Sequence, residues 1–515
     1  MIVHQKLNAG AALLAAALGV LPMTSHAGLF DQFFGMFGGG GTTTTTGSTT
    51  IPADAYLKGT YSAVVNWPLI PIHMVLLPDG RIMSYGTDAQ GAQTGQFNYD
   101  VWDPSKGTGT ASHLVLPNTT GTDLFCSAQI VVPSSGAVLL TGGDRTINGV
   151  RNYSADDVNF FDYKYNALSA SPQRMSALRW YPSVVTLANG KVLVLGGRAD
   201  PNTPAPTPEL YSEAEGWSSL SGATSDDAYG TRNWSYPRAW QAPNGQVFLA
   251  TIWGGTYYVN ATGQGSLAAT PLKLTEGDVY LPSVMYAPGK ILAFRKLNKA
   301  VVIDINGATP TATAVTGVGQ DRYHSSATVL PNGQVFVNGG SAVTNVANGV
   351  TYQAKLWNPT TKAWTAAATA SKMRLYHSAS LLLPDATVLT AGGGAPGPVT
   401  NLNAEIYTPP YLYKANTLAV RPVIQSAPTV ATWGASFNAS TDVTGISRVT
   451  LVKTGSATHT VDFDQRFMEL KYTAAGTTLT IQAPTSANIA PPGYYMLFVF
   501  NSAGVPSVAK VIKLG

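Results

Sequence analysis

Cysteine and charge are both scarce in this chain. Its 515 residues include one cysteine, Cys126, and only 11% are charged. One thiol excludes an internal disulfide framework and a thiolate-rich zinc site, because both need several cysteines. The excess of basic over acidic residues, 31 against 27, is too small and dispersed to favour nucleic-acid binding. Beyond the N-terminus no apolar run is long enough for a transmembrane helix.

The N-terminus has the three parts of a secretory signal peptide, which we assign to residues 1–27. Lys6 supplies the positive charge, residues 9–21 form a short apolar run, and Ser25-His26-Ala27 is a small-residue cleavage site. We therefore expect a secreted, periplasmic or cell-surface protein. In such a protein Cys126 is idle, bonded to another chain, or used chemically.

Residues 28–56 combine a Phe-rich start with a Gly/Thr/Ser linker. The linker composition is typical of a flexible tether. The short, nearly uncharged Phe-rich piece is interpreted as disordered, with contact to a membrane surface or a partner as the alternative.

A repeated pattern from residue 70 to 413 decides the fold class. Each copy has two apolar strands joined by a turn, often followed by Gly-Gly, and successive turns lie 44 to 56 residues apart. This spacing leaves room for four short strands per copy. The turns centre on Gly80, Gly136, Gly190, Gly245, Gly289, Gly333 and Ala386, the last having lost its glycine. Seven copies predict an all-β protein with a seven-bladed kelch-type β-propeller over 57–415, and disfavour a solenoid, whose repeats are shorter.

The last hundred residues have a different pattern. Alternating strands such as 448–452 occur without any Gly-Gly pair. We predict a small immunoglobulin-like β-sandwich over 416–515.

Propeller geometry converts repeat position into position in space. The innermost strands line the central channel, so residues at the start of each should surround one channel mouth. Counting back nine or ten residues from the turns gives Cys126, Tyr181, Tyr236, Tyr280, Tyr323-His324 and Tyr376-His377. Taken singly, each tyrosine or histidine is best explained as a packed wall residue. Together, imidazole, phenol and thiol groups can bind a metal. Imidazole suits copper, zinc, iron or nickel, and phenolate adds an oxygen donor suited to Cu(II).

Several longer motifs match a known family. They are residues 374–378 with 381–385, residues 406–412, residues 456–461 with 464–466, and residues 491–498 with 501–507. In these motifs the chain resembles the galactose oxidase and glyoxal oxidase family of copper radical oxidases. The resemblance covers about residues 57 to 515.

The resemblance implies one copper ion with four protein ligands: Tyr181, Tyr376, His377 and His459. It also implies a thioether bond between Cys126 and the ring of Tyr181, which would carry a radical, and a proton-accepting role for Tyr376. Since His459 lies outside the propeller, a loop of the C-terminal domain would have to reach into the channel. Tyr323-His324 shares the repeat position of Tyr376-His377 and is expected to be structural, while His73 and His113 match no family role.

The implied activity is the two-electron oxidation of small aldehydes or primary alcohols, with O2 reduced to hydrogen peroxide. The copper and the tyrosyl radical would supply one electron step each. Residues 179–182 and 204–209 are more similar to the glyoxal oxidase branch, which favours small aldehydes or short alcohols over galactose-type sugars. Arg238, at a blade entrance, is a candidate substrate contact. We expect a monomer, with a peroxidase as one user of the peroxide.

One departure and two alternatives remain open. In galactose oxidase a tryptophan from the loop after the third Gly-Gly stacks on the cross-linked tyrosine, but here residues 198–204 contain none. Trp234, Trp240 and Trp253 are candidates to replace it. The main alternative is a non-catalytic propeller that binds glycans or a protein partner. A copper protein without a radical is a further alternative, but it has no use for Cys126 beside Tyr181.

Overall fold

The computed structural model describes residues 50–515 except 148, 149 and 201. The expected signal peptide, 1–27, and the Phe-rich and linker residues up to 49 lie outside the described residues. Within the described part, no helix combines the length and apolar character needed to cross a membrane.

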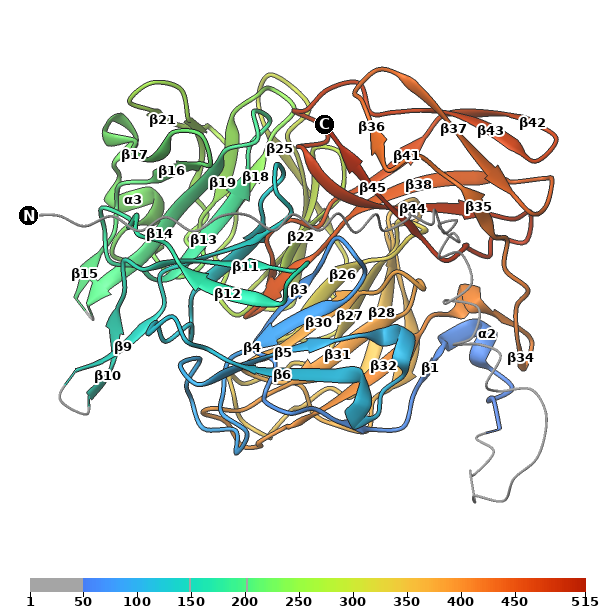
Figure 1. The fold of residues 1–515 in the computed structure, drawn as a ribbon, viewed down its shortest axis with the longest axis horizontal. Helices are drawn as coiled ribbons and strands as arrows, with labels where there is room; N and C mark the ends of the chain where they lie inside the picture. Colours follow the sequence, from blue (N-terminus) through green and yellow to red (C-terminus); the bar gives the residue numbers. More distant parts are fainter. Residues whose placement is uncertain (1–49, 148–149, 201) are drawn as a thin grey trace, which may run out of the picture. The chain divides into compact units, whose positions relative to one another are not determined.

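Seven antiparallel sheets, each with at least four strands, follow one another along the described part of the chain, as the repeats predict (Figure 1). In the first three, the strands from the inside outward are β3 His73–Leu76, β4 Ile82–Tyr85, β5 Asn98–Trp102 and β6 His113–Pro117; β7 Ala128–Val131, β8 Val138–Thr141, β11 Val158–Asp162 and β12 Ala167–Ala170; and β13 Trp180–Thr186, β14 Val192–Asp200, β16 Glu209–Ser212 and β17 Gly216–Ser219. The next three are β18 Arg238–Gln241, β19 Val247–Ala250, β20 Thr256–Asn260 and β21 Ser266–Ala269; β22 Ser283–Ala287, β23 Lys290–Arg295, β24 Lys299–Asp304 and β25 Thr311–Val315; and β26 Ser326–Val329, β27 Val335–Asn338, β28 Gln353–Asn358 and β29 Ala363–Thr369.

The seventh sheet closes the ring with strands from both ends of the propeller. It holds β30 Ser378–Leu382, β31 Val388–Gly392 and β32 Asn403–Thr408, and its outer edge is β1 Thr60–Tyr61 with β2 Val65–Asn66 beside it. Because β1 comes from before the first repeat, the pairing of β1 with β32 fastens the start of the propeller to its end. Short connecting elements are α2 Ala55–Lys58, α3 Asp226–Tyr229, β9 Asp144–Ile147, β10 Val150–Ser154, β15 Thr203–Pro204, and the 3-10 turns Pro104–Lys106, Thr110–Ser112, Ser221–Ala223 and Pro410–Leu412.

The C-terminal part forms two packed sheets, as expected of a sandwich (Figure 1, orange to red). One holds β35 Ile424–Ser426, β37 Ser436–Thr441, β43 Thr478–Gln482 and β42 Tyr472–Ala475; the other holds β36 Val430–Ala431, β45 Lys510–Leu514, β44 Gly493–Phe500, β38 Arg448–Lys453 and β41 Phe467–Leu470. A short hairpin, β33 Tyr413–Lys414 with β34 Thr417–Leu418, leads into it. Met496 and Phe498 of β44 share one apolar core with Leu381 of the propeller, so the two parts are packed together.

A hairpin of the C-terminal part extends the first propeller sheet at its inner edge. Strand β39, Ser456–Thr458, pairs with β3, and β40, Val461–Asp462, pairs with β39. The Gln129 side chain donates to the carbonyl of Ala457 (3.1 Å), and the Ser456 hydroxyl donates to the carbonyl of Gln129 (2.6 Å). The turn of this hairpin carries His459 and Thr460, both in the left-handed region of φ.

The repeated Gly-Gly pairs have a packing role. Gly142 and Gly339 have φ of 71° and 68°, and a Cβ on either would lie 2.2 Å and 2.6 Å from the carbonyl oxygens of Arg179 and Arg374. Real Cβ atoms do not approach that closely, so only glycine fits between neighbouring blades. At the seventh turn Ala386 keeps φ of 69° without a glycine, so the turn conformation survives the substitution.

Candidate metal centre

The inner strands begin with an unusual backbone conformation at the predicted channel mouth. Cys126, Tyr181, Tyr236, His324 and His377 all have φ between 40° and 66°, although none is glycine. This left-handed conformation is uncommon for such residues and costs about 1–2 kcal/mol each. It recurs at the repeat position singled out from the sequence, so the positions are equivalent in the structure as well.

Backbone hydrogen bonds join these positions from blade to blade. The N–H of Tyr181 donates to the carbonyl of Cys126 (3.0 Å), and the N–H of Tyr236 donates to the carbonyl of Tyr181 (2.9 Å). Cys126 and Tyr181 are therefore held in adjacent blades by the main chain itself. The strained residues are fixed by the surrounding structure, as is typical of functional sites.

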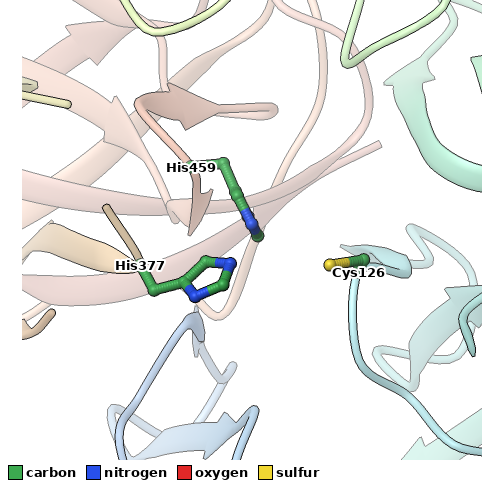
Figure 2. A group of neighbouring side chains, drawn as sticks. All are labelled: Cys126, His377 and His459. Carbon is green, nitrogen blue, oxygen red and sulfur yellow. The ribbon is translucent and has the colours of Figure 1, made fainter. Parts of the chain in front are cut away.

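His377 and His459 bring two imidazole rings together at this place (Figure 2). Their centroids are 4.6 Å apart and the rings are nearly perpendicular, at 87°. His377 Nδ1 donates to the carbonyl of Gly394 (2.7 Å), and His459 Nδ1 is hydrogen-bonded to Thr458 Oγ1 (2.6 Å). Both Nε2 atoms are buried and have no partner. Because a carbonyl only accepts, His377 Nδ1 carries the proton and its Nε2 presents a lone pair.

Two phenols complete the donor set. The hydroxyl groups of Tyr181 and Tyr376 are hydrogen-bonded to each other. The Tyr376 ring stacks on His377, with centroids 3.7 Å apart, and the Tyr181 ring lies 4.8 Å from that of His459. All four side chains are therefore in direct contact.

The thiol of Cys126 faces this group (Figure 2). Its sulfur and one nitrogen each of His377 and His459 all lie within 4.8 Å of one another. In the described part of the chain, no other three His, Cys, Asp or Glu side chains are grouped closely enough to share an ion.

Burial controls the charge of the group. It lowers the pKa of His377 to about 3 and lowers the pKa of His459 too, so both imidazoles are neutral and free to coordinate. Burial raises the pKa of Tyr181, Tyr376 and Cys126 well above their ordinary values. A nearby cation would offset that penalty and favour the phenolate form. Unpaired neutral imidazoles beside two phenols therefore fit a metal ion, and a mixed N and O donor set suits Cu(II).

His324 shares the repeat position of His377 but differs in its partners. Its Nε2 is hydrogen-bonded to Thr344 Oγ1 (2.8 Å), and its ring packs against that of Tyr280 at 4.2 Å. The neighbouring Tyr323 is half-buried and pairs with Ser341. His324 therefore lacks the unpaired Nε2 that marks His377.

The other two described histidines, His73 and His113, have hydrogen-bond partners outside the donor set. His73 stacks on Tyr85 at 4.5 Å, and its Nδ1 is hydrogen-bonded to Gln129. His113 pairs through Nδ1 with Asp100 (2.8 Å). Of the two, only His73 approaches the site, with its ring 5.6 Å from that of His459.

Arg238, predicted as a substrate contact, is buried among carbonyl groups. Its guanidinium donates to the carbonyls of Tyr236 (2.7 Å) and Val279 (2.6 Å) and to Thr460 Oγ1 (3.0 Å). Thr460 directly follows His459 in the hairpin turn. These bonds favour a role in positioning His459, and the substrate contact stays a prediction.

Two tryptophans pack against the ring of Tyr181. The ring of Trp180 lies 4.3 Å from that of Tyr181 at 73°, and the ring of Trp234 lies 6.0 Å away at 87°. Of the three candidates, only Trp234 reaches this tyrosine: Trp240 belongs to a different core, and Trp253 is 51% exposed. Sequence reasoning missed Trp180, although its place immediately before Tyr181 was the available signal.

Comparisons with known proteins find similarity to several oxidases. Residues 421–514 match the family described as Galactose oxidase-like, Early set domain. Galactose oxidase from Gibberella zeae is 31% identical over 496 residues, which cover 88% of this chain and 70% of that protein. Aldehyde oxidase GLOX from Vitis pseudoreticulata is 26% identical over 90% of this chain and 98% of that protein. The solved structure of a fungal alcohol oxidase of the AA5 family, in complex with copper, superposes with a TM-score of 0.79 at 25% identity, covering 88% of this chain and 99% of that one.

Proposed function

Because this chain belongs to the galactose oxidase and glyoxal oxidase family of copper radical oxidases, we propose that it oxidises small aldehydes or primary alcohols with O2 and releases hydrogen peroxide. Small aldehydes are the preferred substrates in this proposal, because residues 179–182 and 204–209 are more similar to the glyoxal oxidase branch. Galactose-type sugars are the second choice. Export rests on the N-terminal signal sequence. A monomeric state and a peroxidase as user of the peroxide are proposed with it.

One observation carries the site assignment. The Nε2 atoms of His377 and His459 are buried without partners next to the paired hydroxyls of Tyr181 and Tyr376. These four residues would hold the copper ion, and Cys126 would be cross-linked to the Tyr181 ring. When bound, copper supplies a one-electron redox step and polarises the substrate oxygen.

The two tyrosines have separate tasks. Tyr376 Oη would accept the proton of the substrate hydroxyl and so act as the general base. Tyr181, in its radical form, would take a hydrogen atom from the substrate carbon. An alcohol loses two electrons and two protons on becoming an aldehyde, and O2 takes up both as hydrogen peroxide. An aldehyde reacts in the same way through its hydrate.

The chain also supplies the conditions that a protein radical needs. Tyr181 is 4% exposed and Cys126 is fully buried, so bulk water is kept from the radical. The cross-link replaces the S–H of Cys126 and a ring C–H of Tyr181 with one S–C bond, and O2 takes up the two electrons and two protons released. Conjugation with sulfur makes the tyrosine easier to oxidise, which suits it to hold the second oxidising equivalent.

The intact mass of the protein tests this proposal directly. After aerobic copper loading, we expect the mass to fall by two hydrogens relative to the copper-free protein, and peptide mapping to place the loss in a Cys126–Tyr181 cross-link. The variant Cys126→Ser is the control: it should keep its mass and lose most of its peroxide release. A free thiol in the copper-loaded wild type, or unchanged oxidase activity in Cys126→Ser, would contradict the radical-oxidase assignment.

A further inference from the structure

A guanidinium group lies between two tryptophans at the edge of the proposed radical site. Arg198, the first residue after the Gly196-Gly197 pair, has its guanidinium carbon 4.3 Å from the ring centroid of Trp180 and 4.6 Å from that of Trp234. Both indoles pack edge-on against Tyr181. Arg198, Trp180 and Trp234 are half-buried, whereas Tyr181 is buried, so these three residues lie between the phenol and solvent.

Two buried hydrogen-bond donors at this place are unsatisfied. Arg198 Nε and Trp180 Nε1 are both buried and have no partner. Among residues 50–515, apart from the three undescribed ones, no carboxylate forms an ion pair with Arg198. Asp200, the nearby acid, instead accepts the N–H groups of Asn202 (2.8 Å) and Thr203 (3.1 Å).

Other buried arginines of the propeller use their terminal N–H groups in hydrogen bonds, although Arg238 Nε and Arg374 Nε are unpaired as well. Arg179 is paired with Glu209 (2.9 Å), and Arg374 is paired with Glu405 (3.1 Å). Arg238 is bound to carbonyl groups. Arg198 has cation–π contacts instead, which hold its position and leave its N–H groups available.

A guanidinium with free donors is best matched by an anion. Its planar fork fits a carboxylate in two parallel hydrogen bonds, and charge-assisted bonds of this kind are among the strongest in proteins. Arg198 is also close to the reacting groups, because both indoles that it contacts pack against the ring of Tyr181. An anion held by Arg198 would therefore lie within a small molecule's length of the phenols.

We propose that Arg198, together with Trp180 Nε1, binds the carboxylate of the substrate and so selects small aldehydes or alcohols that carry an acid group. This inference rests on the proposed oxidase function and names its substrate class. The carboxylate would point toward the two indoles, and the aldehyde hydrate or hydroxyl toward Tyr181 and Tyr376. Arg198 then determines specificity, and the chemistry stays with the two tyrosines.

The first test is equilibrium binding to the copper-free protein, where no oxidation interferes. Glycolate is the probe and ethylene glycol its uncharged counterpart, with quenching of tryptophan fluorescence as the readout. We expect glycolate to bind the wild type and the Arg198→Gln variant to bind it about 10- to 100-fold more weakly, the loss typical of a charge-assisted bond. Arg232→Gln is the matched control, because the exposed Arg232 stacks on Trp253 (5.4 Å) and not on Trp180 or Trp234.

The second test uses the copper-loaded enzyme. The ratio of kcat/KM for glyoxylate to that for glycolaldehyde should fall about 10- to 100-fold in Arg198→Gln. The cause should be a higher KM for glyoxylate, because the variant binds its carboxylate more weakly. Arg198→Lys keeps the charge without the fork and should give an intermediate ratio. An unchanged ratio, or equal glycolate affinity in wild type and Arg198→Gln, would overturn the inference. Absence of peroxide from every substrate, with glycolate binding intact, would instead overturn the oxidase function alone.

Discussion

At the residue scale, the site depends on side chains placed in a backbone conformation that glycine normally occupies. Five residues at the start of inner strands adopt it: Cys126, Tyr181, Tyr236, His324 and His377. The conformation is shared, so it does not by itself distinguish a ligand from a wall residue. Between His324 and His377 the partner of the Nε2 atom makes that distinction, since His324 is bonded to Thr344 and His377 is unpaired.

This difference gives a prediction for copper binding. His377→Asn should weaken copper binding by more than about 100-fold, because losing a ligand should exceed the 10- to 100-fold loss that outer-shell changes cause. His324→Asn should leave the affinity within about threefold of wild type. Asparagine is the chosen replacement because it tolerates the left-handed conformation at both positions. Isothermal titration with Cu(II) under argon measures both affinities, and equal losses in the two variants would contradict the assignment.

At the scale of elements, the hairpin β39–β40 carries Asp462, a half-buried acid with a buried carboxylate oxygen, which should make stability depend on pH. Asp462 accepts N–H groups of Ser456 (2.8 Å) and Gln465 (3.2 Å), while its Oδ2 is buried without a partner. Burial raises the pKa of Asp462 to about 6, and the nearby Asp464, itself paired with Lys453, contributes. The folded state therefore holds this proton more tightly than the unfolded state does.

The contribution of Asp462 to the free energy of unfolding is fully present below pH 4. It is lost as the pH rises through about 6, because the carboxyl group must then ionise in the folded state. We expect Asp462→Asn to remove this loss, which amounts to about 3 kcal/mol at most. The measurement is the thermal midpoint of copper-free wild type and variant at pH 4 and pH 7. Asp442→Asn is the control, since exposed Asp442 also accepts a backbone N–H, from Val423 (2.7 Å). A constant difference between wild type and Asp462→Asn at both pH values would contradict the prediction.

The contact between neighbouring blades gives a second prediction for the elements. Gly339 and Gly434 have nearly the same φ, 68° and 70°, but only Gly339 is crowded, by the carbonyl of Arg374. Gly434→Ala should cost about 1–2 kcal/mol, the price of the left-handed conformation alone. Gly339→Ala should cost about 2 kcal/mol more, since the blades must move apart. Urea-unfolding midpoints compare the two, and equal costs would show that the contact contributes nothing.

The sequence predicted the repeating elements because their signals are local. Each Gly-Gly pair and turn lies within a few residues of the strands it joins, and repetition made the pattern visible. The pairing of β39 with β3 is not local, so only the resemblance suggested that His459 enters the channel. The sandwiching of Arg198 and the bonds of Arg238 could not be predicted, because they depend on how side chains from separate blades pack.

At the scale of the whole molecule, the donor set draws on both major parts of the chain. Tyr181, Tyr376 and His377 come from propeller blades, whereas His459 comes from the C-terminal hairpin. A shared metal ion would therefore act as a bridge between the two parts. Ligand binding to the folded state alone stabilises it, by about 2.7 kcal/mol at a hundredfold excess over Kd.

Copper should thus protect both parts together. We expect copper to slow hydrogen exchange in peptides covering residues 456–463 as well as residues 375–379, measured by mass spectrometry. In His459→Asn the protection of 456–463 should disappear, because its only ligand is gone. Protection confined to the propeller in the wild type would contradict the bridging role of His459.

The late position of His459 in the chain also orders events during biosynthesis. The ribosome synthesises Cys126, Tyr181 and the strands of all seven blades before it synthesises the β39–β40 hairpin, which pairs with β3. Until then the channel mouth lacks one of its four proposed ligands, so a nascent or prematurely terminated chain cannot mature into an oxidant. Formation of the radical therefore requires the β39–β40 hairpin, so only a chain translated through its C-terminal part can form it.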